Sequence, residues 1–131
     1  MSTQQASASR GLREPGPDHP IEISAAPHRI IVRANGRVLA DSRAALNLVE
    51  AGHEPVLYIP RGDVDMTALQ RVTQTSFCPY KGDCSYYGLA SAPNAPPLAW
   101  SYEAPGTKAT MSIAGHLAFY KDRVESIDEE G

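Results

Sequence analysis

The chain has 131 residues, of which 42% are hydrophobic and 21% are charged, so it is long enough to bury the core of one domain and too apolar to be disordered throughout. Its 12 basic and 15 acidic residues give a net charge of −3, which argues against a nucleic-acid-binding protein, because nucleic acid binding needs clustered Lys and Arg. No apolar run reaches the roughly 20 residues that cross a bilayer, and the N-terminus lacks the apolar core of a signal peptide, so we expect a cytoplasmic protein that does not associate with membranes.

The first twenty residues divide into two segments. Residues 1–10 are polar and have no period, which predicts a disordered tail. Residues 11–20 contain three prolines and two glycines, which exclude a helix or a central strand but allow an extended arm lying over the domain. We expect a single β domain over residues 11–128 that includes this arm, followed by a solvated tail at residues 129–131.

The first strands are predicted from alternation and turn chemistry. Apolar and polar residues alternate at residues 21–23, as in a half-buried strand. Residues 29–34 and 37–40 are two apolar runs separated by Asn35-Gly36. Both turn residues tolerate the positive φ of a type I′ turn, so this segment predicts a β-hairpin.

The middle of the chain is less clear. Residues 41–50 suit either a short helix capped by Asp41 or Ser42, or a strand with alternating apolar residues. Residues 56–59 predict a short strand that ends at Pro60. A short helix is expected over residues 66–72, because Met66, Leu69 and Val72 would share one face and Asp63 or Asp65 would cap it.

The second half of the chain predicts more strands. Pro105-Gly106 is typical of a turn. Strands are expected at residues 85–90, 98–102, 110–114, 116–121 and 124–127, with the third and fourth of these paired around Gly115. Seven to nine short strands with one helix indicate a mainly β, antiparallel domain.

One segment, residues 77–87, carries more reactive side chains than any other. It contains both cysteines, three of the six tyrosines and a lysine. We therefore take it as the candidate site around which the other strands are arranged. Its sequence is FCPYKGDCSYY.

Several separated motifs resemble those of a bacterial family, the domain of unknown function 427. In chain order they are REPGPDHP (13–20), VLADS (38–42), Glu50, YIPRGDV (58–64), CPYKG (78–82), AWSY (99–102) with Pro105, and AFY (118–120). The resemblance implies a small β-tent, in which two sheets meet over a central pocket, and no established activity. A nucleotidyltransferase label attached to the family is not supported by these residues, because the chain shows no paired carboxylates with a Gly-Ser motif. The family usually has a small residue at the position of Cys84, so this thiol is not expected to share its chemistry.

Cys78 is the candidate nucleophile. A cation three residues away, at Lys81, would lower the pKa of the thiol and raise its thiolate fraction. The more common fate of a cysteine is burial as a small apolar side chain. Five residues separate Cys78 from Cys84, which is wider than a zinc-binding pair, and the four histidines are scattered, so we expect no metal.

Charged and aromatic residues supply the candidate ligand contacts. Lys81-Gly82 and Arg61-Gly62 each offer a cation and a backbone N–H to an anion, unless the lysine simply lies in solvent. Glu50 and Asp63 end apolar elements and would provide a ligand group or a general base, although Glu50 would equally pair with Lys81 or Arg61, and Asp63 would equally cap a helix.

The aromatic residues of two neighbouring strands would form a wall for a planar ligand. Trp100 and Tyr102 should share one face of their strand, whereas Tyr86 and Tyr87 should face opposite sides. Tyrosine and tryptophan combine an apolar ring with a polar tip, which suits a planar or cyclic ligand. The alternative is that these rings belong to the core.

These patterns favour a domain that binds a small polar or planar ligand without a cofactor. The predicted ligand-binding residues are Glu50, Tyr58, Arg61, Asp63, Tyr80, Lys81, Gly82, Tyr86, Trp100 and Tyr102. The first alternative is an enzyme with Cys78 as its nucleophile, and the second is a structural or interaction domain without pocket chemistry. The prediction that these residues form one site fails if Lys81, Trp100 and Glu50 lie on different faces of the domain.

Overall fold

A computed structural model describes residues 11–131 of the chain, and the tail predicted for residues 1–10 lies outside them. The strands are β1 (Ile21–Ala25), β2 (Arg29–Ala34), β3 (Arg37–Ser42), β4 (Leu46–Glu50), β5 (Val56–Tyr58), β6 (Leu69–Cys78), β7 (Gly82–Leu89), β8 (Ala99–Ser101), β9 (Ala118–Phe119) and β10 (Ser126–Glu130). The 3-10 helices are η1 (Arg61–Asp63), η2 (Met66–Ala68) and η3 (Lys108–Ile113). The predicted mainly β, antiparallel class is confirmed.

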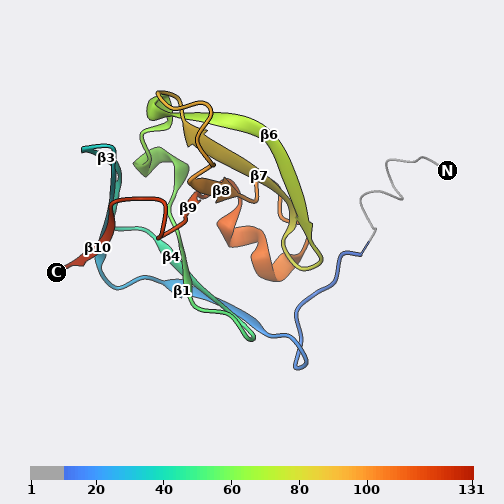
Figure 1. Ribbon diagram of the computed structural model, residues 1–131. Coiled ribbons are helices and arrows are strands. Elements are labelled where there is room, and N and C mark those ends of the chain that lie inside the picture. Colours follow the sequence, from blue (N-terminus) through green and yellow to red (C-terminus); the bar gives the residue numbers. More distant parts are fainter. Residues whose placement is uncertain (1–10) are drawn as a thin grey trace.

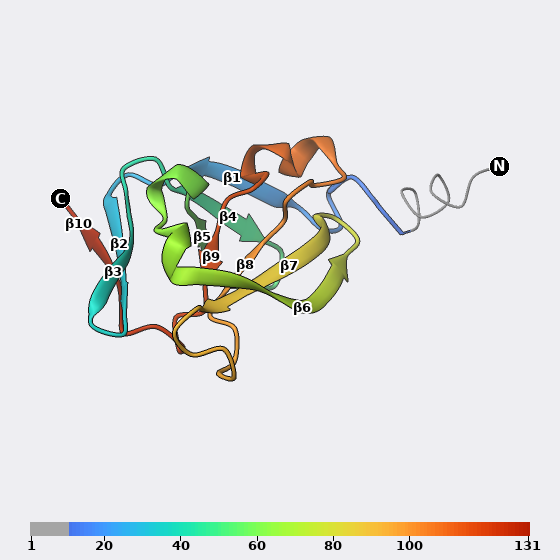
Figure 2. The same ribbon diagram turned by 90° about the horizontal axis from the view of Figure 1, so that it is seen from above.

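The strands form three antiparallel sheets, ordered β1-β4-β5, β10-β2-β3 and β6-β7-β8-β9. In Figures 1 and 2 the sheet of β10, β2 and β3 lies at one end of the molecule, and the hairpin turn of β6 and β7 lies at the other. The described helical segments are all short, and none has the length and apolar character of a membrane span.

The predicted hairpin is present as β2 and β3. Asn35 and Gly36 have φ values of 55° and 74°, which are the two positive values that a type I′ turn requires. β10 pairs with the other edge of β2 and places Ile127 opposite Val32. Glu129 and Glu130, expected in a solvated tail, belong to this strand, although their side chains are exposed.

The ambiguous segment, residues 41–50, ends in a strand. β4 pairs with β1 on one side and with β5 on the other, and this position favours the extended alternative. Leu48 is 1% exposed between its two neighbours. A helix here would leave both neighbouring strands without a partner.

The helix predicted over residues 66–72 is wrong. Asp65 does accept a hydrogen bond from the backbone of Thr67, but the turn that it caps, η2, is only three residues long. β6 begins at Leu69, which pairs with Leu89 of β7. The β-branched side chain of Val72 and the pairing of seven β6 residues with β7 outweigh the helical spacing.

The strand pair predicted at residues 110–114 and 116–121 is also wrong. Residues 108–113 form η3, and only Ala118–Phe119 remain extended, paired with β8. Thr110 is fully buried, and its hydroxyl, the donor, lies 3.2 Å from the carbonyl of Thr107 in the same turn and 3.2 Å from that of Tyr80. Local hydrogen bonds of this kind favour a turn over a strand ladder.

The core consists of two clusters of apolar side chains. The larger is centred on Ile30, Val32, Leu39, Ile59 and Leu117. The smaller contains Leu48, Tyr58, Cys84, Tyr102, Ile113 and Ala118, which come from the β1-β4-β5 and β6–β9 sheets, from η3 and from the chain directly after β8. The smaller cluster forms the floor of the candidate site, since its partly buried members open onto a cavity.

Residues 11–20 pack against the β6–β7 turn. The amide of Arg13 donates to the carbonyl of Pro79 at 2.8 Å, and the Glu14 carboxylate accepts from the amide of Lys108 at 3.0 Å. Leu12 packs so closely that a Cβ on Gly106 would lie 2.6 Å from its methyl group. The arm thereby brings His19 to the same side of the molecule as the candidate site.

Candidate functional site

A cavity of about 400 Å³ lies where β4 and β5 face β6, β7 and β8. Seven of the eleven residues predicted from the sequence line it. They are Glu50, Tyr58, Cys78, Lys81, Tyr86, Trp100 and Tyr102. Glu50, Lys81 and Trp100 therefore meet at one site rather than on separate faces.

Strand alternation explains which aromatic rings reach the cavity. Tyr86 and Trp100 are direct partners on β7 and β8, and both line it. Tyr87 points to the opposite face, where it joins the larger core cluster. The predicted division between Tyr86 and Tyr87 is confirmed, and so is the shared face of Trp100 and Tyr102.

A buried ion pair lies at one end of the cavity, next to the β6–β7 turn. The Lys81 ammonium donates to Oε1 of Glu50 at 2.9 Å, and Nε2 of His19 lies 2.8 Å from Oε2. The Lys81 and Glu50 side chains are only 12% and 11% exposed. We call His19, Glu50 and Lys81 the Glu50 cluster.

Glu50 is held as a carboxylate. Burial raises its pKa, but the hydrogen bonds from Lys81 and His19 outweigh this and leave the pKa below its usual range. The Lys81 ammonium also lies 5.2 Å from the centroid of the Tyr102 ring, within the range of a cation–π contact. The cluster therefore presents a nearly neutral pair of fixed charges.

The aromatic wall is held together by its polar tips. The indole N–H of Trp100 donates to the Tyr58 hydroxyl at 3.2 Å, and the two rings meet edge to face. The other side of Trp100 packs on Tyr120, with centroids 4.6 Å apart. The Tyr86 and Ser76 hydroxyls are 2.8 Å apart. Burial raises the pKa of Tyr58, so its hydroxyl stays protonated and available as a donor.

The two cysteines are both free but lie in different surroundings. Cys78 is half-buried and lines the cavity. Cys84 is 1% exposed in the smaller core cluster, and burial raises the pKa of its thiol, so it stays protonated. The cation predicted to activate Cys78 is hydrogen-bonded to Glu50 instead.

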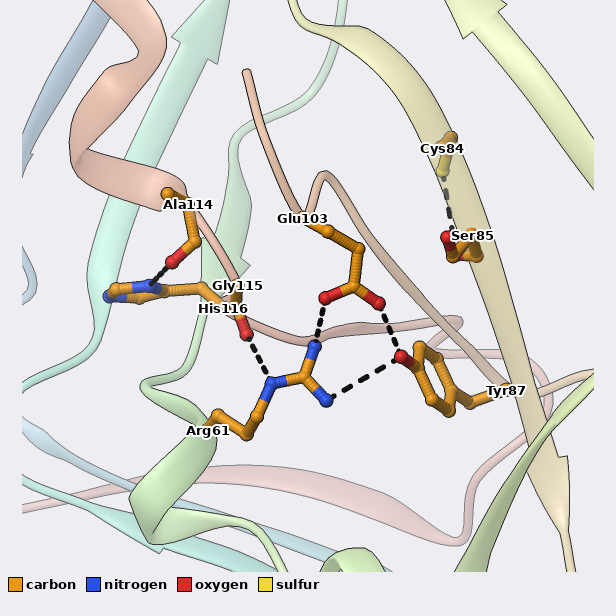
Figure 3. A network of polar contacts seen from close by, with 8 residues as sticks. All are labelled: Arg61, Cys84, Ser85, Tyr87, Glu103, Ala114, Gly115 and His116. Atoms are coloured by element: carbon orange, nitrogen blue, oxygen red, sulfur yellow. Dashed lines mark hydrogen bonds and ion pairs between the residues drawn. The ribbon is translucent and has the colours of Figure 1, made fainter.

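Arg61 belongs to a second polar cluster, away from this cavity (Figure 3). Its guanidinium donates to Glu103 at 2.5 Å and to the carbonyl of Gly115 at 3.1 Å, and it lies 3.5 Å from the Tyr87 hydroxyl. Tyr87 also donates to Glu103. We call Arg61, Tyr87 and Glu103 the Arg61 cluster. It ties the segment after β5 to β7 and to the loop after η3.

The remaining three predicted residues do not line the cavity either. Asp63 accepts a hydrogen bond from the Ser42 hydroxyl at 2.7 Å, so it braces β3 against η1. The Tyr80 ring stacks on His19 with centroids 4.2 Å apart. Gly82 has a φ of +93°, and a Cβ there would meet the backbone of Gly106 at 3.3 Å. These residues shape the surroundings of the cavity.

Two of the contributors that were not predicted from the sequence contact Glu50 or Trp100. His19, in the arm, contacts Glu50. The sequence offered one hint of this contact, because His19 is a polar residue in a segment that was expected to lie over the domain. Tyr120 lines the cavity, and alternation from Ala118, which pairs with Trp100, would have placed it there.

The polar groups that line the cavity are two carboxylates, an ammonium, an imidazole, phenols, an indole and one thiol, the imidazole and the second carboxylate coming from His53 and Glu54. Across residues 11–131, no three His, Cys, Asp or Glu side chains gather as a metal site would require. No curated protein matches the chain. A family model described as domain of unknown function (DUF427) matches residues 22–130, which cover β1 to β10 except for Ile21, and the chain belongs to this family.

Proposed function

We propose that this protein binds a small planar molecule with polar substituents in the cavity between β4 and β8. The observation that carries the proposal is the convergence of a buried Lys81–Glu50 pair and a wall of tyrosines and tryptophan on one cavity of about 400 Å³. This volume falls in the range of small-molecule sites, which are typically about 300–1,000 Å³.

The charges of the cavity favour an uncharged ligand. Glu50 and Lys81 neutralise each other, and the Glu54 carboxylate at the edge of the cavity is paired with Lys121, so neither an anion nor a cation gains a full counter-charge. Both groups keep further hydrogen-bonding capacity, because an ammonium has three donors and a carboxylate accepts more than two bonds. A planar ring with an amide or a pair of carbonyl groups would stack on Trp100 or Tyr86 and bond to this pair.

A thermal-shift screen of planar amides, such as benzamide and nicotinamide, tests this proposal. Bound compounds should raise the Tm of the wild-type protein and change the fluorescence of Trp100, the single tryptophan of the chain. Lys81→Met should abolish both effects. Lys108→Met, which removes a lysine from an exposed position of η3, is the matched control and should preserve them. Shifts that survive Lys81→Met and Tyr86→Leu would place binding elsewhere.

A second candidate is an enzyme that uses Cys78 as its nucleophile. The position of this half-buried thiol on the wall of the cavity favours it. The test is the pH dependence of alkylation at Cys78 in the wild type and in Lys81→Ala. Reaction well below pH 8, lost with the lysine, would support the enzyme. No alkylation before denaturation would make Cys78 a packing residue.

A further inference from the structure

A second and larger cavity, of about 570 Å³, adjoins the proposed binding site. Its walls include Val32 of β2, Ile59 beyond β5, Phe119 of β9 and Ile127 of β10. Val32 and Ile59 are members of the larger core cluster, so this cavity lies directly against that cluster. The interior of this cavity is therefore apolar.

The two cavities share a wall. Trp100, Tyr120, Val56 and Glu54 line both of them. Trp100 and Tyr120 pack on each other, and the indole is fixed from the other side by its hydrogen bond to Tyr58. A molecule that stacks on Trp100 in the first cavity therefore contacts a side chain that also lines the second.

The charged residues that line the second cavity, Glu54, Lys121 and Asp122, are all exposed, so the charges lie at its rim. The Lys121 ammonium donates to the Glu54 carboxylate at 2.6 Å, and these side chains are 75% and 79% exposed. Solvent screens such an exposed ion pair, so the two side chains are held together only weakly. The interior behind the pair offers contacts to methyl and methylene groups rather than to polar atoms.

We infer that the ligand is amphipathic, with its planar polar head in the cavity of the Glu50 cluster and an alkyl or similarly apolar tail in the cavity bounded by Val32, Phe119 and Ile127. This inference rests on the proposed function, since the head must bind for the tail to be placed. The occupant is one molecule that passes the Trp100–Tyr120 wall. The contrast between a polar end and an apolar end defines its class.

The experiment uses alkyl esters of 4-hydroxybenzoate, from methyl to heptyl, which keep one planar polar head and lengthen only the tail. Binding is measured by titration of Trp100 fluorescence. Each added methylene group should tighten the Kd about three- to four-fold until the second cavity is filled, after which the Kd should level off. Equal Kd values along the series would overturn the inference while leaving the proposed function standing. Absence of binding for every ester would overturn the inference, and absence of binding for the planar amides as well would contradict the proposed function.

Two variants test whether the gain in affinity per methylene group arises in the second cavity or from a general preference for apolar compounds. Ile127→Phe and Leu57→Phe each fill part of it, and Leu57 serves if the first variant does not fold. Both should retain the Kd of the methyl ester and reduce the gain per methylene group to less than about 1.5-fold. Val38→Phe, at a 44% exposed position of β3, is the matched control and should keep the full gain. An unchanged gain in both cavity variants would overturn the inference.

Discussion

The Glu50 cluster and the Arg61 cluster are built from similar groups but differ in what surrounds them. Each pairs one carboxylate with one long cation, and each cation lies within cation–π range of a tyrosine ring, Tyr102 for Lys81 and Tyr87 for Arg61. The Lys81–Glu50 pair is 12% and 11% exposed and lines a cavity, whereas Arg61 and Glu103 are 37% and 35% exposed and join loops. Burial next to a cavity, rather than the residue types, distinguishes a candidate binding site from a cluster that only holds segments of the chain together.

The same comparison explains why Arg61 was predicted as a ligand contact. Arg61 and Lys81 each precede a glycine, and nothing in this local pattern tells them apart. The difference arises from distant segments, since β4 supplies Glu50 to one cation and the chain after β8 supplies Glu103 to the other.

The largest effect is expected from Glu50→Leu, because it leaves the Lys81 ammonium buried without its partner. We expect the free energy of unfolding to fall by about 3 kcal/mol and the Tm by roughly 10 °C. Urea unfolding and calorimetry measure these values. The double variant Glu50→Leu/Lys81→Met should recover more than half of the loss. A single variant as stable as the wild type would show that the pair is hydrated.

Acid should weaken the Glu50 cluster selectively. The pKa of Glu50 is lowered in the folded protein, so its contribution to stability is complete above its ordinary value of 4.5 and is lost as the pH falls through the lowered folded value. The wild type should therefore lose more stability than Glu50→Gln between about pH 4.5 and pH 3. Urea unfolding across this window measures the difference, with Glu22→Gln on the exposed side of β1 as the control. Parallel curves for wild type and Glu50→Gln would contradict the assignment.

A smaller effect is expected when the Arg61 cluster is broken. Glu103→Gln keeps the shape of the side chain but removes the charge that faces Arg61. Because solvent screens this pair, the loss in unfolding free energy should stay below about 1 kcal/mol. The Kd for a planar ligand should not change, since neither residue lines the cavity. A loss equal to that of Glu50→Leu would remove the distinction between the clusters.

The smallest effect is expected for Lys121→Gln. The Lys121–Glu54 pair is the most exposed ion pair named above, and high exposure makes such pairs nearly neutral for stability. The Tm should not change measurably in calorimetry at low salt. A clear decrease would show that the rim of the second cavity is held more firmly than its exposure indicates.

The features predicted well from the sequence are those set by neighbouring residues. Asn35-Gly36 specifies its own turn, and alternation specifies that Tyr86 and Tyr87 face opposite sides. The helix predicted over residues 66–72 was wrong because the long pairing of β6 with β7 decides that segment.

The candidate site was predicted only in part for the same reason. The motif around residues 78–82 located Cys78 and Lys81, but the contact between His19 and Glu50 joins positions 31 residues apart and depends on how the arm packs. The second cavity had no sequence signal at all. It arises where β2, β5, β9 and β10 meet, and no local pattern encodes such a meeting.

The pairing of β10 with β2 has a consequence for how the chain folds. β2 and β3 are joined by a two-residue turn, and such hairpins form within microseconds. The other edge of β2 pairs with β10, which lies far along the chain. Arg33 of β2 and Asp128 of β10, which form an ion pair, are 95 positions apart. Until β10 has paired, Ile30, Ile31 and Val32 present an unpaired apolar edge. Refolding at high protein concentration should therefore produce aggregates through this edge, in competition with the native sheet.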